Sequence, residues 1–422
     1  MTKSVCASEV SGTSIAPSSK SIAQRAIVAA LLASGTSILR NLTLCDDTEA
    51  ALSIAKILGA DVKEDGYDYH IISKSITTLP QKEQTLFCGE SGLLTRMIIP
   101  VASLLSSPVT ITGNGSILGR PIDMIEKPLQ DLGVCIRINR GFLPAVIEGP
   151  LKGGTANIDG NISSQILTGL LLALPLAKQD SAVYVHNLKS KPYIDLTIDL
   201  LQSFGIVVEN KNYEIFRING NQQYRAISYN IEGDWSAASC LLVAGVIAGE
   251  VTINNLDTNS LQADKAILDA LQLANTNVCI RQNKPFCSVT TTYSNYLKPF
   301  EFDANECPDL FPALVVLASN CNGISKIHGT KRLPHKESNR ALALQQEFGK
   351  LGITIAVNDD TMLITGGTIT GGKVSSHNDH RIAMALATAA LKSTGKVIIS
   401  GAESVNKSYP QFWNDLQSLT KQ

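Results

Sequence analysis

The sequence predicts an α/β protein of two domains, each an inside-out α/β barrel of three β-α-β-α-β-β units with parallel helices buried at its centre. Three observations predict this fold class. Helices end on glycine or asparagine at a period of about seventy residues, a second series of helices begins on polar residues at the same period, and the second series is apolar on nearly every face. A chain of 422 residues also exceeds one ordinary hydrophobic core, which favours two domains.

The first series consists of helices that stop and lead into strands. A helix often ends on a residue in the left-handed conformation, for which glycine is best suited and asparagine second. Paired, alternating strands follow four of the ends, over residues 62–72, 134–147, 206–218 and 353–364. The ends, spaced by 74, 72, 70 and 77 residues, are Leu58-Gly59, Leu132-Gly133, Phe204-Gly205, Ala274-Asn275 and Leu351-Gly352.

The second series of helices begins on short polar segments, in step with the first. The runs 166–177, 237–248 and 310–318 are apolar around most of the helix, so we expect them to be buried on nearly all sides. Partner helices, such as 121–132 and 336–351, have a charged face and belong near solvent. The polar starts, at intervals of 72, 71, 71, 75 and 70 residues, are Ser19-Lys20-Ser21, Glu90-Ser91-Gly92, Ser163-Ser164-Gln165, Gly233-Asp234, Pro308-Asp309 and Asn378-Asp379-His380.

The sixth unit reaches the C-terminus without a following strand pair. The strand-like N-terminal segment, residues 3–10, can supply a missing strand. We therefore expect a discontinuous C-terminal-type domain of residues 1–18 and 233–422, with an N-terminal-type domain of residues 19–232 inserted into it.

Composition and charge exclude several classes of function. The formal net charge is -1, so no global field attracts nucleic acid or an anionic membrane surface. The longest apolar stretch, residues 166–177, is too short to span a bilayer, which takes about 20 residues. Nine cysteines without a C-x-x-C pair, and no N-terminal signal segment, predict reduced thiols and a cytoplasmic protein.

Cations gather at the ends of the predicted elements. If the buried helices run parallel, their N-termini meet at one end, where free N–H groups and partial positive charge favour anions. Lys336 and Arg340 are expected to share a helix face, with Glu337 beside them. Guanidinium groups suit phosphate and carboxylate, so a site for small anionic molecules is expected. The cations are Lys20, Arg25, Arg96, Arg120, Lys336, Arg340, Arg381 and Lys407.

Other chemistries lack their motifs. The chain has no Walker A sequence, and Gly113-Asn114-Gly115 with Gly119 misses the dinucleotide-binding spacing. His377 and His380 have no third ligand at a recognised spacing, so no metal site is expected. Ser163-Ser164 lacks the context of a nucleophile elbow, and no cysteine stands in a basic motif.

Ten short motifs, in order along nearly the whole chain, resemble those of the 5-enolpyruvylshikimate-3-phosphate synthase family. Each motif is modest alone, but the ordered set is specific. That family has the inside-out α/β fold of two domains, in agreement with the repeat. The motifs are Ser18-Ser19-Lys20-Ser21 with Arg25, Gly92 with Arg96, Gly119-Arg120-Pro121, Ser163-Ser164-Gln165, Ser190-Lys191-Pro192-Tyr193, Gly233-Asp234, Pro308-Asp309, Lys336-Glu337-Ser338-Asn339-Arg340, Asn378-Asp379-His380-Arg381 and Lys407.

The resemblance implies transfer of the enolpyruvyl group of phosphoenolpyruvate to the 5-hydroxyl of shikimate 3-phosphate, with release of phosphate. This is a step of the shikimate pathway. We also expect the protein to be a monomer and to need no cofactor. By resemblance, the residues holding shikimate 3-phosphate are Lys20, Ser21, Arg25, Ser163, Ser164, Gln165, Ser190, Tyr193, Asp309 and Lys336. Those holding phosphoenolpyruvate are Lys20, Gly92, Arg96, Arg120, Gln165, Arg340, Arg381 and Lys407.

Asp309, Glu337 and Lys20 are the expected catalytic residues, because addition and elimination require proton transfers to and from the substrates. Their division into acid and base stays open. Without the resemblance, Asp309 is interpreted as a helix cap and Glu337 as an ion-pair partner. Three positions depart from the usual family pattern and leave the shape of the phosphoenolpyruvate pocket open; they are Glu90, Leu93 and Asn339.

Two rival functions remain. An enolpyruvyl transferase acting on UDP-N-acetylglucosamine typically carries a cysteine in the loop before the Gly-Arg-Pro turn, and here residues 113–118 contain none. A non-catalytic anion-binding protein that kept the fold would bind the ligands without turnover.

Overall fold

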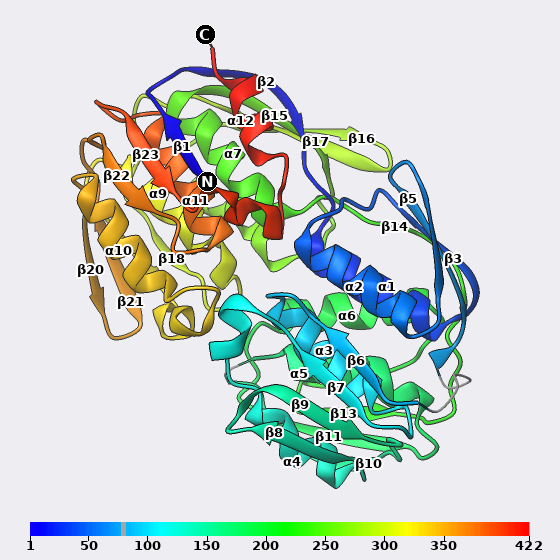
Figure 1. Ribbon diagram of the computed structural model, residues 1–422. Coiled ribbons are helices and arrows are strands. Elements are labelled where there is room, and N and C mark those ends of the chain that lie inside the picture. The colour runs from blue at the N-terminus through cyan, green and yellow to red at the C-terminus, as the bar shows by residue number, and fades with distance from the viewer. Residues whose placement is uncertain (77–81, 162, 422) are drawn as a thin grey trace. The chain divides into compact units, whose positions relative to one another are not determined.

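The computed structural model describes residues 1–76, 82–161 and 163–421. The chain divides into two compact units: unit 1 comprises Met1–Ser19 and Glu232–Gln422, and unit 2 comprises Lys20–Ile231. Within the described residues each unit contains three small sheets (Figure 1). The sheets are open at their edges rather than closed into barrels, but the order of layers is the predicted one, with helices inside and sheets outside.

Unit 2 holds three four-stranded sheets, and each combines one parallel pair with two antiparallel pairings. The strand orders are β14-β3-β5-β4, β6-β7-β9-β8 and β10-β11-β13-β12. The strands are β3 (Ser34–Arg40), β4 (Asp61–Asp65), β5 (Asp68–Lys74), β14 (Ser228–Asn230), β6 (Gln84–Phe87), β7 (Val109–Thr112), β8 (Cys135–Asn139), β9 (Phe142–Glu148), β10 (Gly154–Asp159), β11 (Ser181–His186), β12 (Glu209–Lys211) and β13 (Ile215–Ile218).

Three helices form the centre of unit 2, and three more lie nearer solvent. The central helices are α1 (Lys20–Leu32), α3 (Gly92–Ala102) and α5 (Gln165–Ala173), and α3 contacts both of the others. The outer helices are α2 (Asp46–Ile57), α4 (Glu126–Asp131) and α6 (Lys191–Ser203). Short 3-10 turns are η2 (Gly115–Gly119), η3 (Asp123–Ile125) and η4 (Leu174–Leu176).

Unit 1 repeats this plan with one shorter sheet. The strand orders are β16-β17-β15-β2, β18-β19-β21-β20 and β1-β23-β22. The strands are β1 (Thr2–Val5), β2 (Val10–Ile15), β15 (Gly249–Leu256), β16 (Val278–Asn283), β17 (Phe286–Thr292), β18 (Glu301–Asp303), β19 (Ile324–His328), β20 (Thr354–Asn358), β21 (Thr361–Thr365), β22 (Gly372–Ser375) and β23 (Val397–Ser400).

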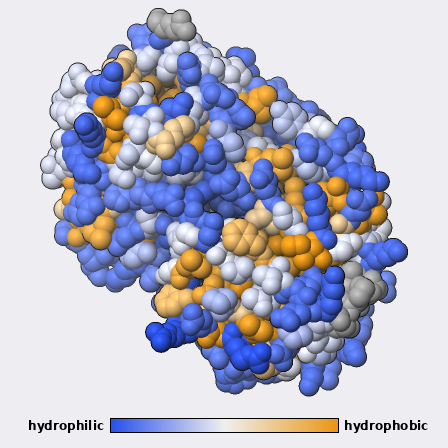
Figure 2. Space-filling model, in the orientation of Figure 1, coloured by the Kyte–Doolittle hydropathy of each residue, from blue (hydrophilic) through white to orange (hydrophobic). Residues whose placement is uncertain are grey.

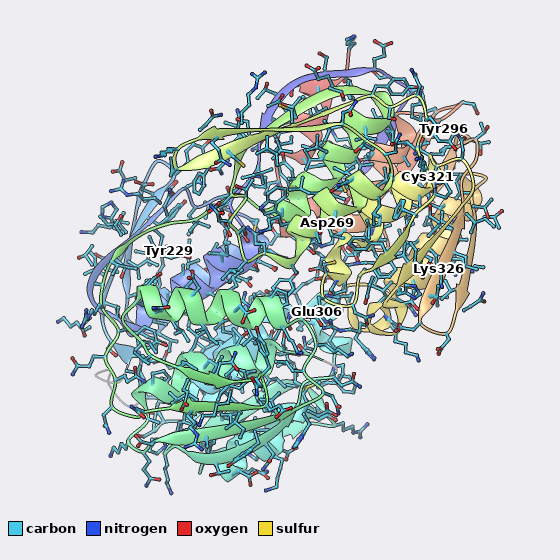
Figure 3. All side chains as sticks on the ribbon, turned by 180° about the vertical axis from the view of Figure 1, so that it is seen from behind. Tyr229, Asp269, Tyr296, Glu306, Cys321 and Lys326 are labelled. Atoms are coloured by element: carbon cyan, nitrogen blue, oxygen red, sulfur yellow. The ribbon has the colours of Figure 1, made fainter. Side chains whose placement is uncertain are left out.

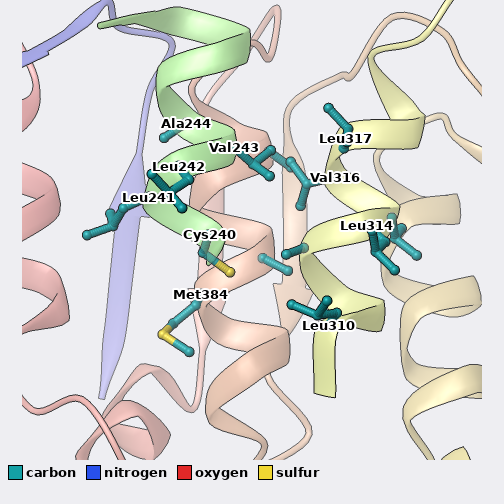
Figure 4. Packing of buried hydrophobic residues seen from close by; sticks show 14 of the residues in the cluster. Cys240, Leu241, Leu242, Val243, Ala244, Leu310, Leu314, Val316, Leu317 and Met384 are labelled. Atoms are coloured by element: carbon teal, nitrogen blue, oxygen red, sulfur yellow. The ribbon is translucent and has the colours of Figure 1, made fainter. Parts of the chain in front are cut away.

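The central helices of unit 1 pack against one another in a single apolar core. They are α7 (Trp235–Ala248), α9 (Phe311–Ser319) and α11 (His380–Ala390). Val243 of α7, Leu314 of α9 and Met384 of α11 are fully or almost fully buried there (Figure 4). The remaining helical segments are α8 (Ile267–Leu273), α10 (Arg340–Lys350), α12 (Phe412–Leu419), η5 (Ala263–Ala266), η6 (Pro308–Leu310), η7 (Thr330–His335) and η8 (Ala402–Lys407).

The burial of the apolar helices is confirmed. Every residue of α7 and α9 is buried, and so is every residue of α5 after Gln165. A helix without a polar stripe has no face to offer to water, so it can only be packed on all sides.

The helix ends behave as predicted from the repeat. Gly59, Gly133, Gly205 and Gly352 have φ of 86°, 86°, 81° and 86°, and Asn275 has φ of 64°. All five therefore occupy the left-handed region, where a side chain on Cβ is strained and glycine is favoured. A strand pair follows each of these ends.

The N-terminal segment contains two strands where one was expected over residues 3–10. The first, β1, lies antiparallel to β23 and completes the sheet of the sixth repeat, as predicted. The second, β2, pairs in parallel with β15 instead. Correspondingly, β14 pairs in parallel with β3, and its Tyr229 packs against the ring of Phe204 with centroids 6.1 Å apart (Figure 3). The chain passes from unit 1 to unit 2 after β2 and returns to unit 1 after β14. Each of these two strands belongs to a sheet of the unit that the chain is about to leave.

Two outer helices are shorter than predicted. The segment expected as a helix over residues 121–132 contains η3 and the six-residue α4, because Pro128 has no N–H and is tolerated only in a first turn. The helix expected from 336 begins at Arg340, where Asn339 Oδ1 accepts a hydrogen bond from Leu342 N at 3.3 Å. Lys336 therefore precedes the helix and shares no helix face with Arg340.

The visible surface is largely hydrophilic, with apolar residues in small patches (Figure 2). Among the described residues, the structure contains no helix with both the length and the apolar character needed to cross a membrane.

Candidate active site

In unit 2, the N-termini of the three central helices are joined by side-chain hydrogen bonds. Gln24 Nε2 of α1 donates to Ser91 Oγ, the N-cap of α3, at 2.8 Å. Arg96 Nη1 of α3 donates to Gln165 Oε1, on the first residue of α5, at 2.9 Å. These contacts bring three helix N-termini, with their partial positive charge, to one place, which we call the unit 2 cluster.

Arg25 is a buried cation of this cluster. Its side chain is 1% exposed, and it donates to Thr197 Oγ1 at 2.9 Å and to the carbonyl oxygen of Ser21 at 2.8 Å. Within the described part of the chain no carboxylate pairs with it, and burial lowers the pKa of Arg25 to about 10 although the nearby Tyr193 opposes this. A desolvated guanidinium without a counter-charge favours an incoming anion.

Lys20, the first residue of α1, has a carboxylate partner that the sequence did not single out. Its Nζ lies 2.9 Å from Asp47 Oδ2, and the two side chains are 15% and 8% exposed. Asp47 is in the first turn of α2, where a carboxylate also suits the helix dipole. Lys20 is thus held at the helix end instead of extending freely into solvent.

Arg96 of α3 contacts the segment that carries Arg120, and the Arg120 guanidinium lies against Gly92, the first residue of α3. Arg96 Nη2 donates to the carbonyl oxygen of Pro121 at 2.9 Å, and both arginines are largely buried. A Cβ on Gly92 would lie 2.5 Å from Arg120 Nη1, so only glycine allows the guanidinium this position. Glu90, one of the departures from the usual pattern, accepts from Ser116 N at 2.8 Å and so holds the loop before Arg120.

The predicted hydroxyl residues occupy the same end of unit 2. Ser163 Oγ accepts from Gln165 N at 3.2 Å, and Ser164 is the buried N-cap residue of α5. Ser190 precedes α6 in a left-handed conformation with φ of 57°, which is unusual for a residue other than glycine and often marks a functional site. Tyr193 lies one turn further, and its carbonyl oxygen faces Arg25 Nη2 at 3.5 Å.

In unit 1, three cations converge on one carboxylate. Asp309 Oδ1 lies 3.1 Å from Lys336 Nζ and 2.8 Å from Arg340 Nη1, and Asp309 Oδ2 lies 3.5 Å from Arg381 Nη2. The helix-cap interpretation of Asp309 is wrong, because Leu310 is the N-cap residue of α9 and Asp309 precedes it in η6. We call Asp309 and its three cations the unit 1 cluster.

Arg340 is the centre of this network. It is completely buried, and besides Asp309 it binds Glu337 Oε2 at 2.6 Å and Asp379 Oδ2 at 3.0 Å. The ion-pair interpretation of Glu337 is therefore confirmed. Asp379 also caps α11 by accepting from Arg381 N at 3.0 Å, which ties the start of that helix to Arg340.

The charged groups of the unit 1 cluster shift one another's pKa values. Burial raises the pKa of Asp309, but Lys336, Arg381 and Arg340 outweigh burial and hold that pKa well below its usual range. Burial lowers the pKa of Lys336, with partial compensation from Asp309. Asp309 is consequently ionised throughout the physiological pH range.

Lys407 and His380 complete the cationic region of unit 1. Lys407 Nζ, on the last residue of η8, donates to the carbonyl oxygen of Asn378 at 2.7 Å and is 6% exposed. His380 is the buried first residue of α11. In the part of the chain that the structure describes, no three His, Cys, Asp or Glu side chains are grouped as metal ligands.

Asp264 is a buried carboxylate near the unit 1 cluster that no spacing pattern indicated. It is 2% exposed and accepts a hydrogen bond from Ser236 Oγ. Burial raises its pKa to about 6, and the repulsion of Asp309 adds to this effect. The folded protein therefore binds a proton at Asp264 more tightly than the unfolded chain does, and the stability gained from that proton is lost as the pH rises from about 4 to about 6.

We expect Asp264→Asn to raise the free energy of unfolding by about 1–2 kcal/mol at pH 7.5, because the variant buries no charge there. The gain should shrink as the pH is lowered from 6 and vanish near pH 4. Denaturant unfolding across this range tests it, with Asp269→Asn on the exposed side of α8 as the matched control (Figure 3). A gain that does not depend on pH would contradict the explanation.

Comparison with known proteins gives one consistent result. Residues 6–416 match the family profile described as EPSP synthase (3-phosphoshikimate 1-carboxyvinyltransferase). The chain is 37% identical to the 3-phosphoshikimate 1-carboxyvinyltransferase of Clostridium novyi, covering 98% of this chain and 96% of that one. It is 39% identical to the enzyme of the same name from Clostridium acetobutylicum, covering 96% and 94%.

Solved structures agree on the fold. An EPSP synthase from Acinetobacter baumannii superposes with a TM-score of 0.85 at 24% identity, covering 99% of this chain and 98% of that one. The enolpyruvyl transferase NikO from Streptomyces tendae superposes with a TM-score of 0.78 at 18% identity, covering 99% and 96%.

Proposed function

This chain belongs to the EPSP synthase family, and we propose which of its residues bind the substrates and move the protons of the family's reaction. The reaction transfers the enolpyruvyl group of phosphoenolpyruvate to the 5-hydroxyl of shikimate 3-phosphate and releases phosphate, in the pathway to the aromatic amino acids. Both substrates carry a phosphate and a carboxylate, so bringing them together requires fixed positive charge.

Shikimate 3-phosphate is assigned to hydroxyl and charged residues, most of which belong to the unit 2 cluster. The support is the desolvated guanidinium of Arg25, which lacks a carboxylate partner among the described residues and stands among hydroxyls suited to a sugar-like ring. The proposed residues are Lys20, Ser21, Arg25, Ser163, Ser164, Gln165, Ser190, Tyr193, Asp309 and Lys336.

Phosphoenolpyruvate is bound mainly by guanidinium groups at helix starts. These groups form two parallel bonds to a carboxylate or phosphate, and each charge-assisted bond contributes about 1.5–3 kcal/mol. Arg96 donates to Gln165 Oε1 at 2.9 Å, which supports assigning both side chains to the same ligand. The proposed residues are Lys20, Gly92, Arg96, Arg120, Gln165, Arg340, Arg381 and Lys407.

The chemistry is an addition followed by an elimination. In the addition, the methylene carbon of phosphoenolpyruvate takes a proton, the 5-hydroxyl oxygen bonds to the neighbouring carbon, and the hydroxyl gives up its proton. In the elimination, the new methyl group loses a proton, the double bond re-forms, and the bond to the phosphate oxygen breaks. One proton is delivered to the substrates and two are removed. The second removed proton is taken up by the phosphate as it leaves, so the protein gains no net proton.

We assign to Asp309 the removal of the proton from the 5-hydroxyl group. Its carboxylate is held ionised by Lys336, Arg381 and Arg340, so it can accept a proton but has none to give at neutral pH. Glu337 and Lys20 are the candidates for the proton exchanged with the methylene carbon; Glu337 is bound to Arg340 at 2.6 Å and Lys20 to Asp47 at 2.9 Å.

The observation that carries this proposal is the convergence of three cations on Asp309. Phosphate release from phosphoenolpyruvate should be rapid with shikimate 3-phosphate and absent with UDP-N-acetylglucosamine. Release with the nucleotide sugar would assign the chain to the rival transferase reaction. Binding of both ligands without any release would leave only an anion-binding protein.

We also propose a monomer that acts in the cytoplasm without a cofactor. All nine cysteines are free thiols, as expected of a reducing compartment, and each proposed step uses only the side chains named above. Light scattering after size-exclusion chromatography tests the first point, with 45.1 kDa expected.

Gly92→Ala is expected to raise the KM for phosphoenolpyruvate by about tenfold, because the new methyl group would overlap the Arg120 guanidinium and displace it. The KM for shikimate 3-phosphate should change by less than about twofold. Steady-state kinetics with each substrate varied in turn provide the measurement. Gly349→Ala on α10, where a Cβ meets nothing within 4 Å, is the control. Equal rises in both KM values would contradict the geometry.

A further inference from the structure

The turn of residues 375–378 has an unusual backbone. His377 and Asn378 have φ of 52° and 56°, so two successive residues other than glycine occupy the left-handed region. Within the turn, Ser375 Oγ accepts from His377 N and Ser376 Oγ accepts from Asn378 N, each at 3.1 Å. Ser376 also joins the turn to the end of β23, because its N donates to the carbonyl oxygen of Ser400 at 3.0 Å and its Oγ donates to that of Gly401 at 2.8 Å.

Glu347 of α10 attaches the turn to unit 1 from a second element. Its side chain is 1% exposed; Oε2 accepts from Ser375 N at 2.9 Å, and Oε1 lies 2.7 Å from His377 Nε2. Lys350 Nζ lies 2.8 Å from both carboxylate oxygens. Burial raises the pKa of Glu347, but the bonds from Lys350, Ser375 N and His377 lower it below its usual value. The buried, ionised carboxylate of Glu347 thus binds both a backbone N–H of the strained turn, that of Ser375, and the side chain of His377.

The position of the 375–378 turn affects the positions of two cations, Lys407 and Arg381. The carbonyl oxygen of Asn378 accepts from Lys407 Nζ at 2.7 Å. The next residue, Asp379, caps α11, binds Arg340 and accepts from the backbone N–H of Arg381. A shift of the turn would therefore move the carbonyl group that holds Lys407 and the helix start that carries Arg381.

One helix holds this segment at two points. Arg340 is the first residue of α10 and binds Asp379, while Glu347, two turns along the same helix, binds the turn before it. We propose that Glu347 and His377 are positioning residues for phosphoenolpyruvate binding, acting through the 375–378 turn on Lys407 and Arg381 without touching substrate. This inference rests on the assignment of Lys407 and Arg381 to phosphoenolpyruvate.

Steady-state kinetics of the full chain, with the KM of each substrate measured separately, test the proposal. Glu347→Ala is expected to raise the KM for phosphoenolpyruvate about tenfold, with the KM for shikimate 3-phosphate changed less than about twofold. Glu347→Gln should cause a smaller rise of about threefold, because the amide oxygen can still accept from Ser375 N. Lys350→Met is the matched control; it removes the other partner of Glu347 and should leave both KM values within about twofold.

His377→Asn isolates the side-chain bond. Asparagine tolerates the left-handed conformation but is too short to reach Glu347, so a rise in the KM for phosphoenolpyruvate of about fivefold is expected without a large loss of stability. This variant decides the question if Glu347→Ala does not fold.

Three results would overturn the inference: a KM for phosphoenolpyruvate within about twofold of wild type in folded Glu347→Ala and in His377→Asn, an equal rise in both KM values, or the same effect in Lys350→Met. A parallel Lys407→Met variant separates this inference from its premise. If Lys407→Met raises the KM for phosphoenolpyruvate and the Glu347 variants do not, only the positioning role fails. If Lys407→Met has no effect, the assignment of Lys407 fails and the inference fails with it.

Discussion

Asp309→Asn is expected to lower kcat by about 1000-fold, because an amide cannot take the proton of the 5-hydroxyl and general-base catalysis contributes about 100- to 10,000-fold. Binding should survive. Asparagine keeps the shape of the side chain, and the loss of one negative charge leaves Lys336, Arg340 and Arg381 with a larger net positive charge toward anionic ligands.

The measurement is kcat together with the equilibrium dissociation constant of each substrate. Asp303→Asn is the matched control, because Asp303 is an exposed aspartate on the neighbouring strand β18. The acceptor role of Asp309 would be abandoned if kcat fell by less than about tenfold, or if the main effect were weaker binding of shikimate 3-phosphate.

Arg340→Met is expected to damage both stability and binding. The guanidinium is completely buried among Asp309, Glu337 and Asp379, so its removal leaves three carboxylates without their shared cation. Breaking a buried ion pair by removing one partner costs about 3–5 kcal/mol of unfolding free energy. The KM for phosphoenolpyruvate should also rise by about 100-fold, since Arg340 is one of the cations assigned to this ligand.

Denaturant unfolding and steady-state kinetics check the two parts. Adding Asp379→Asn to Arg340→Met should recover part of the stability, because one uncompensated charge is removed, but it should not recover the KM. Arg281→Met on the exposed strand β16 serves as the control. A stability loss below about 1 kcal/mol would show that Arg340 is not the centre of the network.

The parts of the fold that could be predicted from sequence are those determined by local chemistry. Gly59, Asn275 and their counterparts end helices because few other residues adopt the left-handed conformation at low cost. The apolar runs that became α5, α7 and α9 have no polar face, so their burial follows from composition alone.

The pairing of the strands was harder to predict from the sequence. The three-residue strand β14 and the six-residue β2 carry little pattern of their own, and their partners β3 and β15 are chosen by tertiary packing. The split of the N-terminal segment into two strands that join different sheets therefore could not be inferred from residues 3–10 alone.

The cations of the candidate site could be predicted as a group but not in their pairing. Lys336 and Arg340 are brought together by Asp309 rather than by a helix face, because Asn339 starts the helix after Lys336. A recurring position at helix starts was enough to find the arginines. It also singled out Asp309 and Asp379, but it did not show that both carboxylates bind Arg340.

Three other carboxylates, which the sequence did not indicate, lack a motif or have a partner distant in sequence. Asp47 binds Lys20, and Glu347 binds His377, at separations of 27 and 30 residues. Asp264 lies in a 3-10 turn with no motif around it. Such residues become visible only when the folded chain shows what is buried beside them.

Calorimetric titration of the full chain with shikimate 3-phosphate alone tests most directly which cations hold this ligand. Arg25→Met, in the unit 2 cluster, should weaken binding by about 30-fold or more, because Arg25 is the desolvated cation assigned to this ligand. Lys407→Met, in unit 1, should leave the dissociation constant within about threefold. Unchanged binding in Arg25→Met, or a large loss in Lys407→Met, would contradict the assignment.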